Sequence, residues 1–245
     1  LRTMADAVWK NRRTDDRGRL YLPRYLNGKG WHGRMGDNSM EGIYANIRAN
    51  IYLATMKEGD LARVLECPIE GRVGHEDFHE GGLERQWIRF LQGQNPAWPE
   101  KALDDNLARV RRQIEWLRKH LSDPSLRKDG ADLWIQWRVG VGYCASLVQG
   151  MTGGIMPLWH GQLHLARFRY FDPVRKRPGI PMDCAALVDS VSDDTASLTL
   201  VNLHPNENRE IWVQTGAYAE HRCLEITPDE GKPVVVSNHL FSVRL

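Results

Sequence analysis

The segment His75-Glu76-Asp77-Phe78-His79 places two histidines and a glutamate at the spacing of an HExxH motif. On an α-helix, residues i and i+4 share one face, so the two imidazoles can bind the same Zn²⁺ ion. The intervening Glu76 can then polarise a metal-bound water for attack on a substrate. The spacing therefore indicates a zinc-dependent hydrolase as one candidate function.

Two acidic residues further along the chain extend this pattern. Glu100 follows His79 by 21 positions, and Asp104 comes four residues later, so the pair reads E-x-x-x-D. Together with the HExxH motif, this resembles the gluzincin metallopeptidases, which take a third ligand from a downstream helical Glu. The resemblance implies that His75, His79 and Glu100 are zinc ligands, that Glu76 is the general base and that Asp104 orients a ligand.

The residues around the motif also allow a second interpretation. Gly81 and Gly82 follow the second histidine, and each glycine costs about 1 kcal/mol in a helix interior. Pro99 places Glu100 in the first turn of a helix, where an acidic residue is expected for the helix dipole alone. The segment 71–82 is therefore either a metal-binding turn or a polar loop that leads into the next helix, near Leu83.

Tryptophan is abundant, and eight of the nine tryptophans precede position 160. Bulky aromatic side chains usually serve burial in a core. They can also form the walls of a cleft that stack on sugar rings. The candidates for this second role are Trp31, Trp134, Trp137 and Trp159.

The elements that must position these residues are helical in the first part of the chain. Apolar residues recur at steps of three and four in Leu103, Leu107, Val110, Ile114, Leu117 and Leu121, which predicts an amphipathic helix that packs on a core through this stripe. Similar spacing and capping residues predict four more helices, over 4–10, from Asp37 or Ser39 to 54, over 83–91 and over 132–147.

After Trp159 the apolar period changes from helical to two, as in β-strands. Short apolar runs occupy 185–188, 198–201, 211–213, 223–226, 234–236 and 240–243, with turn residues between them. Strands at this spacing indicate an antiparallel sandwich or barrel. The predicted fold class is α+β, with a helical domain over 1–160 and an antiparallel β-sandwich domain over 161–245.

Composition and charge exclude several classes of partner. Lys+Arg 33 against Asp+Glu 31 gives a net charge of +2, so the chain lacks the basic field that nucleic-acid binding requires. No apolar run approaches the roughly 20 residues of a membrane-spanning helix. We therefore expect a folded globular protein that binds neither nucleic acid nor membrane.

The order of helices and strands resembles a known arrangement. The tail from Leu198 through 210–218 to 241–245 is similar to the small antiparallel β domain that follows the catalytic domain of many glycoside hydrolases. Trp-rich helical hairpins before such a domain resemble the end of an (α/α) toroid. The segment 167–173 also resembles large bacterial proteins of this organisation. The resemblance implies a carbohydrate-active hydrolase with a carbohydrate as its partner and no cofactor.

Such chemistry needs two carboxylates, one as general acid and one as base or nucleophile. The resemblance places them at the mouth of the helical domain, and the candidates there are Glu76, Asp37 and Glu80, followed by Glu41, Asp77 and Glu84. A third class of function is a non-catalytic interaction module. Because both ends of the sequence lie within periodic segments, we expect a piece of a longer protein. It would associate with the remainder of that protein or with a second copy of itself.

Overall fold

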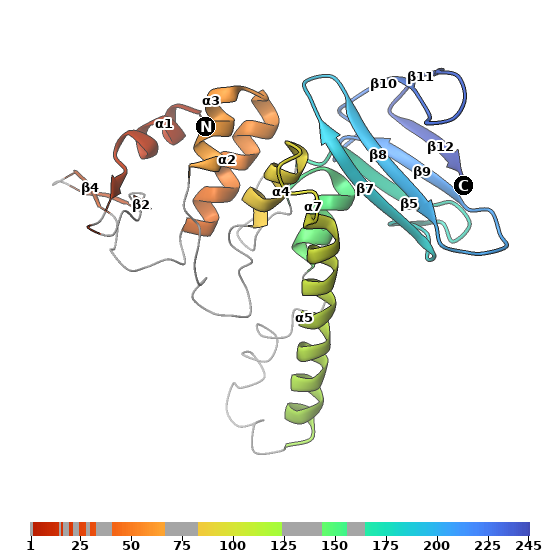
Figure 1. Cartoon of the computed structure of the whole chain (residues 1–245), viewed down its shortest axis with the longest axis horizontal. Helices are drawn as coiled ribbons and strands as arrows, with labels where there is room; N and C mark the ends of the chain where they lie inside the picture. The colour runs from red at the N-terminus through yellow and green to blue at the C-terminus, as the bar shows by residue number, and fades with distance from the viewer. Residues whose placement is uncertain are drawn as a thin grey trace. The chain divides into compact units, whose positions relative to one another are not determined.

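A computed structural model describes residues 2–14, 16, 20–21, 25–27, 30–32, 41–66, 83–123, 144–155 and 165–245. These residues contain six α-helices and twelve β-strands (Figure 1), and every strand pair is antiparallel. The fold class is therefore α+β, as the sequence predicts. The contacts divide the chain into two compact units, 1–147 and 148–245. We call them the helical unit and the β unit.

The described residues of the helical unit form five helices and two short hairpins. They are α1 (Arg2–Lys10), α2 (Glu41–Thr55), α3 (Glu58–Leu65), α4 (Leu83–Leu91) and α5 (Trp98–Leu121), with β1 (Arg13–Thr14) paired to β2 (Leu20–Tyr21) and β3 (Tyr25–Asn27) paired to β4 (Gly30–His32). Helices α1, α2, α4 and α5 agree with the sequence prediction. Helix α3 and the hairpins were not predicted, because elements of two to eight residues are too short to show a clear period.

The core of the helical unit lies between α2, α3 and α4. Leu53 of α2, Val64 of α3 and Trp87 and Ile88 of α4 are all buried. These side chains lie on the apolar faces of their amphipathic helices, so their burial drives the helices together. A hydrogen bond from Gln92 to the Tyr52 hydroxyl, 2.9 Å long, joins the end of α4 to α2.

Helix α5 forms as predicted, but its first half does not bury the predicted stripe. Leu103 and Leu107 are 47% and 44% exposed, whereas Trp98, Ala102 and Asn106 are buried. Trp98 stacks on Phe90 of α4 with ring centroids 5.5 Å apart. This contact fixes the rotation of the helix and turns the 98–102–106 face inward. No helix among the described residues is long and apolar enough to cross a membrane.

The described residues of the β unit form one four-stranded sheet and two hairpins. The sheet has the order β12 (Leu240–Arg244), β9 (Glu210–Thr215), β5 (Phe168–Asp172) and β6 (Arg177–Pro178). The hairpins pair β7 (Cys184–Val191) with β8 (Ala196–Asn202), and β10 (Cys223–Ile226) with β11 (Val234–Asn238). The predicted strands from 185 onward all correspond to these elements. The sandwich and the toroid stay predictions.

A close chain crossing lies beside the sheet. Helix α7 (Ala145–Thr152) is followed by Gly153 and Gly154. The predicted helix over 132–147 overlaps the beginning of α7, and its residues 132–143 lie outside the described part. The Tyr170 hydroxyl of β5 donates to the carbonyl oxygen of Met151, 2.5 Å away. Gly154 packs so closely on Leu165 and Ala166 that no Cβ fits there.

Candidate functional site

Most residues that the sequence nominates for chemistry lie outside the described residues. These are the carboxylates Asp37, Glu76 and Glu80, the histidines His75 and His79, and the tryptophans Trp134, Trp137 and Trp159. Their roles stay predictions.

Five nominated residues lie among the described ones. Asp104 is exposed on α5, and Glu41 and Glu84 lie in the first turns of α2 and α4. Glu100 is exposed in the first turn of α5, where an acidic residue favours the helix dipole. Trp31 lies in β4, with its backbone opposite Leu26 of β3. Within the described ranges, no group of three or more His, Cys, Asp or Glu side chains could hold a metal ion. This result leaves the zinc prediction untested, since His75 and His79 are not part of those ranges.

A small open pocket in the helical unit brings polar groups together from three helices. It is lined by Ala5 and Trp9 of α1, Arg48 and Ile51 of α2, and Asp60 and Arg63 of α3. Arg48 is 6% exposed and Asp60 is 2% exposed. Such burial of charged side chains is rare unless they are paired or bind something.

The buried carboxylate of Asp60 has two differently occupied oxygens. Oδ2 accepts a hydrogen bond of 2.7 Å from the Thr55 hydroxyl and lies 3.4 Å from a guanidinium nitrogen of Arg2. Oδ1 has no hydrogen-bond partner among the described residues, and the nearest guanidinium nitrogen of Arg63 is 3.9 Å away. Arg63 donates a much closer hydrogen bond to Asp6 of α1. The second oxygen of Asp60 is therefore buried without a hydrogen bond from the described residues.

Two arginines make cation–π contacts with the tryptophan ring that lines the pocket. The guanidinium of Arg12 lies over the Trp9 ring, 4.7 Å from its centroid, and that of Arg48 lies 5.5 Å from it. Arg12 also donates to the Trp9 carbonyl oxygen at 3.1 Å. These cation–π contacts hold the ring in place. The pocket thus combines a fixed ring, a buried acceptor and guanidinium donors, which is the kind of lining that orients a polar ligand.

Sequence reasoning missed this pocket because none of its residues forms a motif. Asp60 lies in the first turn of α3, where an acidic residue is already explained by the helix dipole. Arg48 and Trp9 lie on helices that the sequence analysis identified only from their apolar period. The one available signal was an arginine in the middle of the apolar pattern of α2.

Comparison with known families gives one match. Residues 11–141, more than half of the chain, match a family described as Domain of unknown function, DUF8034. The chain belongs to the DUF8034 family. No curated protein and no solved structure matches it. The DUF8034 match contains helices α2 to α5 and the pocket residues Arg48, Asp60 and Arg63, whereas the β unit lies beyond it.

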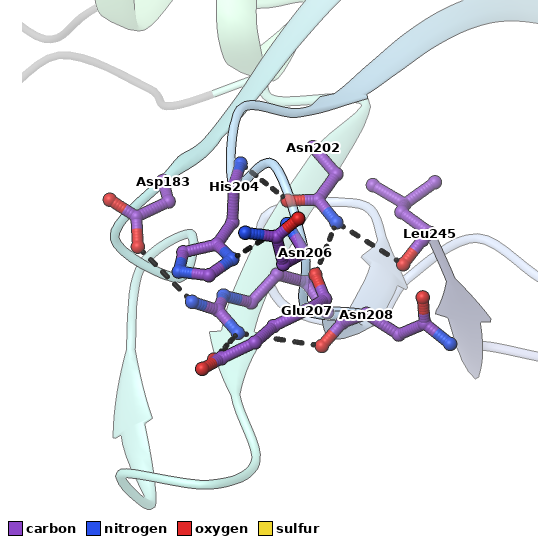
Figure 2. Close-up of polar contacts among 8 residues, drawn as sticks. Asp183, Asn202, His204, Asn206, Glu207, Asn208 and Leu245 are labelled. Carbon is purple, nitrogen blue, oxygen red and sulfur yellow. Dashed lines mark hydrogen bonds and ion pairs between the residues drawn. The ribbon is translucent and has the colours of Figure 1, made fainter.

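A second polar cluster lies in the β unit, outside the DUF8034 match (Figure 2). The guanidinium of Arg209 bridges two carboxylates, Glu207 at 2.7 Å and Asp183 at 3.2 Å. The side-chain amide of Asn202 donates to the carbonyl oxygens of Glu207 and Leu245, at 2.8 and 3.4 Å. The backbones of Arg209 and Leu245 also exchange two hydrogen bonds.

The geometry of this cluster assigns it a structural role. It fastens the loop after β8 to the beginning of β9 and the end of β12. The hydrogen bond from Arg209, assisted by His204, lowers the pKa of Glu207, and the bonds to Glu207 and Asp183 raise the pKa of Arg209. Burial raises the pKa of the neighbouring Cys184 thiol, while Arg209 opposes that rise. Because Arg209 already bonds both carboxylates, the cluster holds the strands together and leaves neither carboxylate without a partner.

Proposed function

We propose that this DUF8034 protein is a carbohydrate-active hydrolase and that the pocket of the helical unit is one of its sugar-binding sites. The observation that carries the proposal is the buried Asp60 carboxylate, which lines a pocket together with Trp9, Arg48 and Arg63. A carboxylate accepts hydrogen bonds from sugar hydroxyls, guanidiniums donate to sugar oxygens, and a tryptophan ring packs on the apolar face of a sugar.

The order of the two units also supports this proposal. A helical unit followed by an antiparallel β unit is the arrangement in the glycosidases that the sequence resembles. Fold likeness alone does not assign chemistry. We propose that the reaction itself uses Glu76 with Asp37 or Glu80, one carboxylic acid protonating the leaving oxygen while the other acts as base or nucleophile.

The proposal is tested by measuring release of reducing ends from a panel of glycans by the whole chain. We expect turnover that resists a chelator, and a loss of at least about a hundredfold in Glu76→Gln, the usual scale for a lost general acid or base. Asp60→Asn should raise KM more than it lowers kcat, because a binding group acts before the chemical step.

Glu58→Gln is the matched control, since Glu58 lies in the same turn of α3 but is exposed. It should leave both constants unchanged. Turnover with normal kinetics in both Glu76→Gln and Asp60→Asn would remove the assignment of these residues. No turnover of any glycan, with association of the chain in solution, would favour the interaction module.

A second candidate, a zinc-dependent hydrolase, rests on the HExxH spacing of His75, Glu76 and His79. Metal analysis of the purified chain separates the two. About one zinc per chain, lost when His75 and His79 are both changed to Ala, would favour this candidate and direct assays to peptides and esters. Absence of bound metal after dialysis against zinc would exclude it.

A further inference from the structure

We propose that α5 pairs in antiparallel orientation with α5 of a second copy of this chain, through the apolar stripe that begins at Leu103 and ends at Leu121. Three observations carry the proposal: the spacing of the stripe, the exposure of its members and the distribution of charge along the helix. The inference goes beyond the proposed function and does not depend on it.

The stripe has the spacing of a coiled-coil seam. Its members follow one another at alternating steps of four and three residues, and all of them lie within α5: Leu103, Leu107, Val110, Ile114, Leu117 and Leu121. Residues at these steps occupy the a and d positions of a heptad, where each side chain inserts between residues of a second helix. A helix that packs on a globular core usually has a wider apolar face. The spacing therefore favours a single helix as the partner of this stripe.

The helical unit packs on a different face of α5. Trp98, Ala102 and Asn106 are buried, and the side-chain amide of Asn106 donates to the Ala102 carbonyl oxygen and to the Ser146 hydroxyl. With 3.6 residues per turn, this buried face lies about 100° around the helix from the centre of the stripe. The core of the helical unit and a second helix can therefore contact α5 at the same time.

Both ends of the stripe are exposed. Leu103 and Leu107 at its beginning are 47% and 44% exposed, and Leu121 at its end is 54% exposed. The three members between them are half-buried. Burial of apolar area is the main favourable term in protein association. A helix that lies along the whole stripe would remove this leucine surface from water.

The charge along α5 selects the direction of the partner. Acidic residues predominate in the first part of the helix, at Glu100, Asp104 and Asp105, and basic residues predominate in the rest, at Arg109, Arg111, Arg112, Arg118 and Lys119. This order suits the helix dipole, and it also makes the beginning of one α5 complementary to the end of another. A parallel pair would instead bring like charges together. The occupant of the stripe is therefore a second α5 that runs in the opposite direction.

The spacing of the stripe also sets the register of the pair. In one antiparallel register, every member meets an apolar residue of the second copy: Leu103 with Leu121, Leu107 with Leu117, and Val110 with Ile114. The exposed carboxylate of Asp104 then flanks the stripe beside the exposed guanidinium of Arg118 from the second copy. Arg111 lies beside its own counterpart at the centre of the pair, and this like-charge contact weakens the association.

The test is sedimentation equilibrium of the whole chain over a wide range of concentrations. Because the seam has only about three heptads, we expect a monomer–dimer equilibrium with a Kd on the order of 50 µM. Leu107→Ala should raise this Kd at least about tenfold, since both copies lose a leucine from the seam. Urea unfolding of Leu107→Ala well below the Kd measures the monomer, so it separates lost pairing from lost folding.

Charge variants test the antiparallel direction. Asp104→Arg should raise the Kd about fivefold, because two like-charge contacts replace two ion pairs. Combining Asp104→Arg with Arg118→Asp should restore the original Kd, since both ion pairs then form with exchanged signs. Arg111→Gln should lower the Kd about threefold by removing the repulsion at the centre. Arg112→Gln is the matched control, because exposed Arg112 lies on the face of α5 opposite the stripe, and it should leave the Kd unchanged.

Each contrary outcome overturns a stated part of the proposal. A monomer at every concentration would overturn the pairing and assign the stripe to another segment of the same chain. A dimer whose Kd is unchanged in Leu107→Ala would place the interface on another surface. A dimer that Asp104→Arg weakens and the combined charge exchange fails to restore would overturn the antiparallel direction. Because none of these measurements uses a glycan, their failure is distinct from a failure of the proposed function.

Discussion

Two polar groups, Asp60 in the helical unit and Thr215 in the β unit, differ in the partners that they contact. In the β unit, the Thr215 hydroxyl donates to the carbonyl oxygen of His221 a few residues away, so the contact shapes a turn. In the helical unit, Asp60 lies beside Arg2 from α1 and Arg63 of its own helix, and one of its carboxylate oxygens is buried without a hydrogen bond from the described residues. This contact of the helical unit therefore brings charged groups together from separate helices, whereas the contact of the β unit closes a turn.

The largest difference between the two units in the free energy of unfolding should come from replacing one glycine in each unit by alanine. A Cβ at Gly154 would lie 2.6 Å from the carbonyl carbon and 2.7 Å from the Cα of neighbouring backbone. Backbone cannot move aside as a side chain can, so Gly154→Ala should destabilise the protein by about 3 kcal/mol. Urea unfolding of the whole chain measures this cost.

The matched change in the helical unit should have the opposite sign. Nothing lies within 4 Å of a Cβ added at Gly59 in α3, and alanine is the better helix former. Gly59→Ala should therefore stabilise by about 0.5 kcal/mol. Equal effects of the two substitutions would contradict the close crossing at Gly154.

Asp60→Asn should cost about 2 kcal/mol, because a buried acceptor loses its charge beside Arg2 and Arg63. Hydrogen exchange by mass spectrometry should show faster exchange in α2 and α3. The strands β5, β9 and β12 should retain their protection. Uniform loss of protection across both units would mean that Asp60 supports the whole chain rather than a local pocket.

The loop over residues 216–221 of the β unit should make the stability of the protein sensitive to acid pH. Burial raises the pKa of Glu220, but hydrogen bonds from the backbone of Tyr218 and Ala217 outweigh it and lower that pKa overall. A carboxyl with a lowered pKa in the fold stabilises the protein above its ordinary pKa. That stability is lost as pH falls through the lowered value.

Glu220→Gln should thus cost about 1 kcal/mol at neutral pH, the scale of a net hydrogen bond, and should flatten the loss of stability between neutral and acid pH. Thermal unfolding across that range measures it. Exposed Glu230→Gln is the control. A pH profile unchanged by Glu220→Gln would show that the loop does not depend on this carboxylate.

The smallest effect is expected at the stripe that sequence analysis assigned to the core of α5. Leu107 is 44% exposed, so Leu107→Ala should change the free energy of unfolding by less than about 0.5 kcal/mol, as exposed positions usually do. If Leu107→Ala instead lowered the free energy of unfolding in urea by about 2 kcal/mol or more, the predicted stripe would be a buried face after all.

The two units also differ in how much of them could be predicted from sequence. The strands of the β unit were predicted because hairpins pair neighbours in sequence, so turn residues and a period of two define them. The sheet order was not predicted, because pairing of β9 with both β5 and β12 depends on contacts distant in the sequence.

In the helical unit, four helices were predicted, but the buried side of α5 was not. Stacking of Trp98 on Phe90 sets the rotation of α5, and no pattern within α5 encodes that contact. The pocket was missed for the same reason, since Trp9, Arg48 and Asp60 come from three helices. The predicted roles of Glu76, His75 and His79 stay predictions.

The most direct test of the proposed sugar site in the helical unit is an NMR spectrum of the tryptophan indole N–H groups. It is recorded with and without the glycan of the panel that the chain hydrolyses fastest, with Trp9→Phe and Trp212→Phe used to assign two of the nine signals. We predict that the Trp9 signal shifts on titration. The signal of Trp212, which is 42% exposed in β9, should stay in place. A shift of the Trp212 signal alone, or no shift at all, would contradict the placement of the sugar site in the helical unit.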